Sequence, residues 1–320
     1  MLSWPRRVSA VDEHALAVNL CGRILPSPLV LASGVAGENT NWLLDAARAG
    51  AGAIVTKSIS MAPREGHPEP TVIEWGHGLI NAVGLRNSGA MVARQNLAEL
   101  GPRLSALGVP LIASIFAETV HGFGEVAEVI ATANPDMIEV NISCPNVEAE
   151  YGRPFASDAE SAAAVTRAVK DAVRCPVIVK LSPNVTDIVA IARAVEDGGA
   201  DAICAINSVT GMVIDIATGA PVLANRTGGV TGPAIRPIAV RCVYEITAAV
   251  KIPVIGLGGV EHGRDVVQMI MAGATAVGVG SAVYVRGPSV FSEILLQLVD
   301  CLDEHGYRSL DEIRGIAHRR

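Results

Sequence analysis

Aromatic residues are scarce in this chain of 320 residues, where Phe, Trp and Tyr together make up 3%. Long hydrophobic runs are missing too: the longest apolar stretches, 109–117 and 253–260, are too short to cross a bilayer. The first residues lack the basic, apolar and small-residue plan of a signal peptide, so we expect a cytoplasmic chain without membrane association. Half of the residues are nevertheless hydrophobic, which excludes a disordered chain and predicts a large core.

Basic residues are also fewer than acidic residues in this chain. The chain has 25 basic and 32 acidic residues, a net charge of −7, and its basic residues do not cluster. A nucleic-acid partner is therefore not expected. The 6 cysteines are scattered and none forms a CxxC pair, so their spacing predicts neither a zinc site nor an iron–sulfur cluster. We expect no metal site in this chain.

Short apolar runs alternate with amphipathic, alanine-rich stretches along the whole chain. Such continuous runs are typical of strands covered on both faces of a parallel sheet. Eight of them predict an α/β fold, a (β/α)8 TIM barrel made of one domain over residues 1–320. An open doubly wound sheet is the alternative, but its GxGxxG fingerprint is absent. The expected strands are 29–33, 53–57, 111–115, 137–141, 177–180, 202–206, 254–257 and 276–279.

Three further segments complete the expected fold. A short N-terminal β-hairpin over 17–25 should turn at Gly22 and close the bottom of the barrel. Two connections, 58–89 and 207–233, are too long for simple turns. Long connections in a compact domain are usually binding loops or lids, so we expect both to lie over the C-terminal face.

Polar residues stand where the predicted strands end, which in a barrel is the catalytic face. Gly258-Gly259 and Gly280-Ser281 follow the last two strands, at the place where barrels often bind phosphate. A phosphate without a dinucleotide fingerprint indicates FMN or a sugar phosphate. The rim residues are Ser33, Lys57, Ser58, Ser114, Asn141, Lys180, Asn207, Ser208, Gly258, Gly259, Gly280 and Ser281.

Cys144 is unusual among the cysteines, because it follows the fourth predicted strand between Ser143 and Pro145. A thiol at the catalytic face is a candidate nucleophile or base. No histidine lies close in sequence, so a Cys–His pair cannot be argued from spacing.

The motif from Asn141 to Asn146, Asn-Ile-Ser-Cys-Pro-Asn, resembles the active-site motif of the dihydroorotate dehydrogenases of pyrimidine biosynthesis. The likeness extends over about 17–298. Residues 81–85 resemble the substrate loop of that family, and Asn207-Ser208 with the following residues resembles its mobile lid, here 209–218. The run 221–237 is similar to class 1B, the catalytic subunit of the NAD-linked type. Class 2 members have Ser in place of Cys144 and a longer, membrane-associating N-terminus.

The resemblance implies a role for each matching residue. Cys144 would take a proton from C5 of (S)-dihydroorotate while a hydride leaves C6 for FMN, one FMN per chain. Lys180 would stabilise the reduced flavin. The substrate would be held by Lys57, Asn81, Ala82, Val83, Gly84, Leu85, Asn141, Asn146, Asn207 and Ser208. The FMN would be held by Ser33, Lys57, Ser58, Ser114, Asn141, Lys180, Ile206, Gly232, Gly258, Gly259, Gly280 and Ser281.

The resemblance also implies partners, because the chain has no NAD fingerprint and no cluster cysteines. A class 1B chain forms a homodimer and pairs with a second subunit that carries FAD and a 2Fe-2S cluster, giving a heterotetramer. The chain departs from class 1B at Ser114, Arg86 and Ser88, where Asn, Gln and Pro are common, and its N-terminus is longer. Three alternatives stay open: a fumarate-linked class 1A enzyme, a dihydropyrimidine dehydrogenase-like enzyme, and a non-redox phosphate-binding barrel with a Schiff-base lysine.

Overall fold

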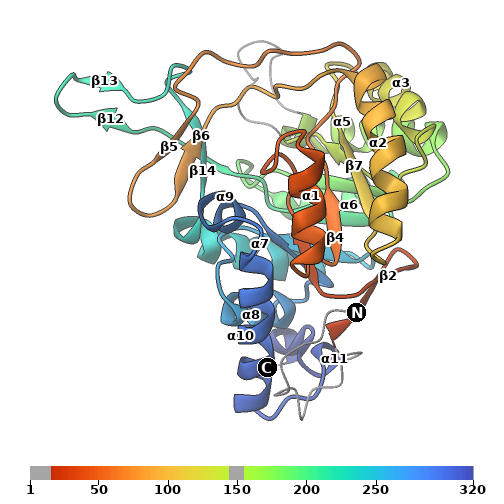
Figure 1. Cartoon of the computed structure of the whole chain (residues 1–320), viewed down its shortest axis with the longest axis vertical. Helices are drawn as coiled ribbons and strands as arrows, with labels where there is room; N and C mark the ends of the chain where they lie inside the picture. The colour runs from red at the N-terminus through yellow and green to blue at the C-terminus, as the bar shows by residue number, and fades with distance from the viewer. Residues whose placement is uncertain (1–15, 144–154, 320) are drawn as a thin grey trace.

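The computed structural model describes residues 16–143 and 155–319, and its centre is a closed barrel of parallel strands (Figure 1). The predicted barrel is confirmed, and every residue of its eight strands is buried. Helices cover the outside of the sheet and its own side chains fill the inside, which explains the continuous apolar runs. In barrel order the strands are β3 (Leu29–Leu31), β4 (Ala53–Val55), β7 (Leu111–Ile115), β8 (Met137–Asn141), β9 (Val177–Leu181), β10 (Ala202–Ala205), β15 (Val254–Leu257) and β16 (Ala276–Val279).

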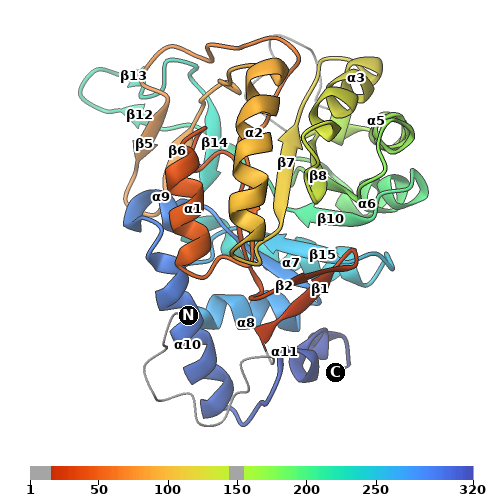
Figure 2. The ribbon, with the colours of Figure 1, turned by 45° about the vertical axis from the view of Figure 1, so that its right-hand side comes forward.

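A helix follows each barrel strand, and together the helices form the outer ring seen in Figure 2. Several begin at side chains that accept a hydrogen bond from the first turn. Asn39, Thr119, Asp158 and Asp187 cap their helices in this way. The ring contains α1 (Thr40–Arg48), α2 (Ala90–Ser105), α3 (Val120–Ala131), α5 (Ala159–Ala172), α6 (Ile188–Asp197), α7 (Arg236–Thr247), α8 (Gly263–Met271) and α10 (Val290–Glu304).

The N-terminal hairpin is also confirmed. Strands β1 (Val18–Leu20) and β2 (Arg23–Leu25) pair antiparallel, and the turn residues Cys21 and Gly22 both have positive φ, 52° and 81°. Two such residues make the tight turn that favours hairpins. The Cys21 thiol donates to the carbonyl of Asp201, just before β10, so the hairpin lies against the N-terminal end of the barrel.

The two long connections contain more structure than the sequence predicts. They pair with each other in a four-stranded antiparallel sheet, here called the outer sheet, whose strand order is β11 (Val209–Gly211), β14 (Gly228–Thr231), β6 (Leu79–Asn81) and β5 (Val72–Glu74). Ile80, Ala82 and Leu223 form its own small core. A second hairpin, β12 (Ile214–Asp215) with β13 (Ala220–Pro221), projects beyond it as an arm (Figure 1).

After β16 the chain forms α9 (Ser281–Arg286), then α10, and ends in α11 (Leu310–Ile313), which packs on α8. The side chains of Leu310 and Ile313 are buried in the main core. None of the helices described for this chain has the length and apolar character needed to span a membrane.

Candidate active site

A cavity of about 230 Å³ opens at the C-terminal ends of the barrel strands. Every barrel strand except β7 contributes to its wall, through its last residues or those that follow. The outer sheet closes the other side with Val72, Leu79 and Thr231. The cavity is therefore bounded by the two sheets, with the polar strand ends of the barrel on one side and residues of the outer sheet on the other.

Most of the sequence-predicted site residues line this one cavity. They come from segments as far apart as β3 and α9, and folding brings them together at the barrel rim. The predicted residues in the wall are Ser33, Lys57, Ser58, Asn81, Val83, Gly84, Leu85, Asn141, Lys180, Ile206, Asn207, Ser208, Gly232, Gly258, Gly259, Gly280 and Ser281.

Four predicted residues are not in this wall. Cys144 and Asn146 lie outside the described residues. Ala82 is buried in the small core of the outer sheet. Ser114 is fully buried on β7, where it donates a hydrogen bond to Glu139 and pairs with Ser58 beneath the cavity floor. A serine in an apolar strand can face either the barrel interior or its rim, and here it faces the interior.

Amide and hydroxyl groups on β8 and β10 form a linked set at the cavity floor. The Asn141 Oδ1 atom accepts from the backbone and hydroxyl of Ser143 at 3.3 and 3.2 Å. The Ser143 hydroxyl in turn accepts a hydrogen bond from Asn207 Nδ2 at 3.0 Å. Asn207 Oδ1 accepts from the amide of Ser208 at 2.8 Å. Two asparagines are thus held in fixed orientations where a ligand with an imide and a carboxylate would need both donors and acceptors.

Two lysines give the cavity positive charge. Lys180 lies on β9, next to Asn141 of β8 in the strand register, and is 5% exposed. Lys57 follows β4 on the opposite side of the barrel, and a Cβ atom added at Gly34 would come within 3.5 Å of its Nζ atom. Cations held in a partly dry cavity favour anionic ligands and negative charge that develops during a reaction.

Glycines after β14 and β15 form a third side of the cavity. Gly232, Gly258 and Gly259 have φ of 93°, 140° and 71°, which other residues rarely adopt. A Cβ atom at Gly259 would come within 2.6 Å of the Gly232 carbonyl oxygen. Backbone without side chains lets an anion approach the peptide groups closely, so these turns fit the phosphate of a mononucleotide cofactor.

A second cavity of about 870 Å³ adjoins the first and shares Gly34, Val35, Lys57 and Val83 with it. Its outer wall contains Arg64, Arg86 and the acidic residues Glu38 and Glu65. The Arg86 Nε atom donates to the Glu65 carbonyl and the Arg64 Nε atom to the Gly84 carbonyl, so both side chains brace the loop of residues 81–85. Lys57 lies where the two cavities meet.

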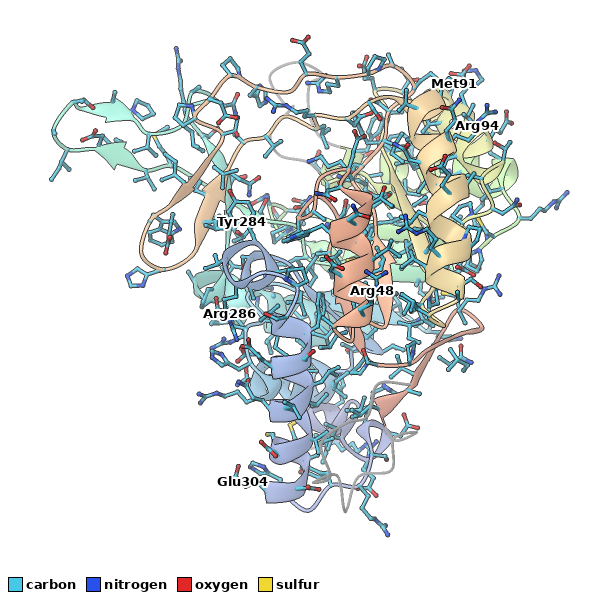
Figure 3. All side chains as sticks on the ribbon, viewed as in Figure 1. Arg48, Met91, Arg94, Tyr284, Arg286 and Glu304 are labelled. Atoms are coloured by element: carbon cyan, nitrogen blue, oxygen red, sulfur yellow. The ribbon has the colours of Figure 1, made fainter. Side chains whose placement is uncertain are left out.

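Sequence reasoning missed several wall residues. Val72, Leu79 and Thr231 come from the outer sheet, whose strands show no clear pattern in the sequence. Tyr284 lies on α9, below the outer sheet in Figure 3, and its position one turn after Ser281 is the one available signal. Across 16–143 and 155–319, no group of three or more His, Cys, Asp and Glu residues is arranged to hold a metal ion.

The fold and the cavity define the chain as a (β/α)8 barrel with a polar, cationic cavity at the C-terminal ends of its strands, bordered by glycine turns. Comparison with known proteins identifies its family. The family model of dihydroorotate dehydrogenase matches residues 15–302, and the chain belongs to that family.

Curated relatives match nearly the whole chain. It is 50% identical over 304 residues to a protein of Methanosarcina mazei, covering 95% of each chain. It is 44% identical to proteins of Methanothermobacter thermautotrophicus and Bacillus pumilus, covering 95% of this chain and 98% and 99% of theirs. All three are named dihydroorotate dehydrogenase B (NAD(+)), catalytic subunit.

Proposed function

We propose that this chain is the catalytic subunit of an NAD-linked dihydroorotate dehydrogenase, which oxidises (S)-dihydroorotate to orotate in pyrimidine biosynthesis. The observation that carries the proposal is the gathering of Lys57, Lys180, Asn141 and Asn207 around one cavity beside the glycine turns. The names of the relatives support the same reaction.

The substrate side of the cavity is formed by amide groups and one lysine. Lys57 neutralises the substrate carboxylate, while Asn81, Asn141 and Asn207 hold the ring through donors and acceptors. Cys144 takes the proton from C5, as the general base of the reaction. The loop 81–85, with Ala82 buried behind it, and Asn146 complete the substrate contacts.

The cofactor side is formed by Lys180, the glycine turns and the serines of β3 and β4. FMN, when bound, supplies the acceptor for the hydride that leaves C6 of the substrate. Gly232, Gly258, Gly259, Gly280 and Ser281 surround its phosphate with backbone groups. Lys180 offers a fixed positive charge to the ring system. The remaining contacts are Ser33, Ser58 and Ile206.

The electrons then leave through a partner. A partner subunit that holds FAD and a 2Fe-2S cluster would supply the route to NAD, and two copies of each chain would form a heterotetramer around a homodimer of this chain. The reaction takes place in the cytoplasm, where the free cysteines among the described residues would stay reduced. A chain that reduces fumarate without a partner is the alternative to this step.

The test is an absorption spectrum of the purified chain, recorded anaerobically before and after dihydroorotate is added. We expect a flavin spectrum that bleaches. A flavin that bleaches with dihydrouracil instead would contradict the substrate, and a chain that binds no FMN would contradict the cofactor and favour the Schiff-base barrel.

Two variants and one partner assay sharpen this test. Cys144→Ala should bind FMN normally and lose most turnover, while Cys301→Ala on α10, remote from the cavity, should bleach at the wild-type rate. The isolated chain should not reduce NAD, and a co-expressed partner should restore that activity. NAD reduction by the chain alone would contradict the need for a partner subunit. So would reduction of fumarate by the chain alone as fast as the complex reduces NAD.

A further inference from the structure

Glu139 is a buried acidic side chain that the proposed reaction does not use. It is 1% exposed, lies on β8 inside the barrel, and is not part of the cavity wall. A buried carboxylate is costly unless hydrogen bonds satisfy it, so its partners indicate what it does. Its neighbour in the strand register is Ser114 on β7.

A chain of hydrogen bonds runs from Glu139 to the cavity floor. The Ser114 hydroxyl donates to Glu139 Oε1 at 3.0 Å. Ser58 and Ser114 are joined through their hydroxyl oxygens at 3.0 Å, and Asn141 Nδ2 donates to the Ser58 hydroxyl at 3.0 Å. Three strand ends, those of β4, β7 and β8, are thereby linked beneath the cavity.

The hydrogens in this series of hydrogen bonds all point one way, toward Glu139. A serine hydroxyl has one hydrogen and an ionised carboxylate has none. Because Ser114 gives its hydrogen to Glu139, the hydrogen between the two serines belongs to Ser58. Ser58 also lies 3.4 Å from the Ser33 hydroxyl, a longer contact than the one to Ser114 at 3.0 Å. With its one hydrogen given to Ser114, Ser58 accepts from the Nδ2 group of Asn141.

This direction, together with the backbone amide of Ser143, fixes the amide of Asn141. Its Nδ2 atom faces Ser58, so its Oδ1 atom faces Ser143, where two donors meet it. The same direction continues through Ser143 to Asn207, which follows β10. Ser58, Asn141 and Asn207 all line the cavity, and therefore the pattern of donors and acceptors that a ligand meets depends on a carboxylate it never touches.

We propose that Glu139 is a positioning residue: it orders the hydroxyl and amide groups of the cavity floor and so sets the affinity for FMN and orotate. The identity of these ligands rests on the proposed function, but the ordering does not. A thiol also lies close to the carboxylate, that of Cys204, next to Lys180 in the register of β10 and β9. Burial, and after it the charge of Glu139, raises the pKa of the Cys204 thiol, which stays a neutral neighbour of the carboxylate.

Glu139→Gln tests the direction, because a glutamine has the same shape but can donate to Ser114 and reverse the chain. Ser114→Ala interrupts the chain of hydrogen bonds, and Ser114→Thr keeps the hydroxyl that continues it. Ile178→Val, at the position next to Glu139 on β9, controls for loss of packing in the same layer. The probes are FMN, titrated into apoprotein by fluorescence, and orotate, titrated by its effect on flavin absorption.

We expect Glu139→Gln and Ser114→Ala each to weaken binding of FMN or orotate about tenfold, the effect of losing one hydrogen bond to a charged group. Ser114→Thr and Ile178→Val should change it less than about threefold, since the chain stays intact. Wild-type affinities in both Glu139→Gln and Ser114→Ala would overturn the proposal. An equal loss in Ser114→Thr and Ser114→Ala would also overturn it, because packing would then be the cause.

A readout without cofactor separates this proposal from the proposed function. In protein labelled with ¹⁵N-asparagine, the side-chain amide signals of Asn141, identified with Asn141→Asp, should shift in Glu139→Gln and Ser114→Ala but not in Ile178→Val. Unchanged signals would overturn the proposal whether or not the wild type binds FMN. A wild type that binds FMN but does not bleach with dihydroorotate would contradict the reaction alone.

Discussion

Arg236 and Asp265 join the two turns that form the glycine side of the cavity. The Arg236 Nη1 atom lies 2.9 Å from Asp265 Oδ1, and the aspartate side chain is 1% exposed. The other oxygen, Oδ2, accepts from the backbone amides of Glu261 and His262 at 3.0 Å each. One carboxylate therefore holds the start of α7, the turn after β15 and the start of α8 together.

Asp265→Asn should loosen this side of the cavity. The variant removes a buried charge and weakens the hydrogen bonds that it accepts, while the Arg236 side chain is 29% exposed, so we expect the free energy of unfolding to fall by about 1.5–3 kcal/mol. Affinity for FMN should fall with it. Urea unfolding and FMN titration measure the two effects. Arg241→Gln is the control, since its pair with Glu245 on the same helix is exposed and should contribute at most about 0.5 kcal/mol. Equal effects of the two variants would contradict the prediction.

Gly259→Ala should damage the cavity more than its backbone angle alone explains. Gly259 and Gly108 share a φ of +71°. The left-handed backbone should therefore destabilise an alanine variant by the same amount at both positions, about 1–2 kcal/mol. Only at Gly259 would the new Cβ atom meet other atoms, the Gly232 carbonyl oxygen at 2.6 Å and the Arg236 Cβ atom at 2.8 Å.

The measurement compares both alanine variants. Gly108→Ala should keep the FMN affinity of the wild type and lose only stability. Gly259→Ala should lose FMN affinity as well, because the glycine turns must shift to admit the methyl group. Full FMN affinity in Gly259→Ala would show that these turns do not hold the cofactor.

The sequence alone predicted the barrel, because each barrel strand is a local, continuous apolar run. It did not predict the outer sheet, whose pairing is distant: Asn81 lies next to Gly229 in the register of β6 and β14. Strand β14 contains Gly228 and Gly229, and glycine has no side chain to mark a strand face.

Some residues of the site could likewise be placed from the sequence, and others could not. Lys180 and Asn141 could be placed at the rim, since the end of a parallel strand faces the catalytic side of a barrel. Ser114 could not be placed, because facing the rim or the interior depends on the exact register of β7 with β8. Tyr284 required the position of α9 relative to the outer sheet, which depends on packing rather than on any local pattern.

Thiol reactivity should single out Cys144 in the native chain. Burial is the largest cause that raises the pKa of Cys21, Cys175, Cys204, Cys242 and Cys301, and for Cys21 the value reaches about 12. Near pH 8 these thiols stay protonated, and the thiolate is the reactive form.

Iodoacetamide at pH 8 should therefore modify Cys144 first, and orotate should protect it. Peptide mass spectrometry after short exposure identifies the modified cysteine. As the pH rises toward 10, the other thiols should begin to react, with Cys301 before Cys21, because burial and the charge of Asp201 raise the pKa of Cys21 to about 12. Modification of Cys301 ahead of Cys144 at pH 8 would argue against an activated base at 144.

The segment 209–218, which resembles a lid, has two parts in the structure. Its first residues form β11 of the outer sheet, and the rest belongs to the projecting arm. Residues of β11 pair with β14, and a Cβ atom at Gly211 would come within 2.6 Å of Val230, so the first part is closely packed. The arm beyond it is exposed, and Ile216 is 98% exposed. Proteolysis requires a segment that can leave its neighbours, which the arm can do and β11 cannot.

Limited digestion with proteinase K should consequently cut the free enzyme within 212–219 and spare 209–211. Orotate should slow that cut, because a site that excludes water during reaction must close over its ligand. Cleavage at Trp75 in the β5–β6 turn serves as the internal reference, since that residue is exposed but lies on the other edge of the outer sheet. If orotate leaves the rates at both sites unchanged, the arm does not close over the substrate, and entry must depend on another part of the rim.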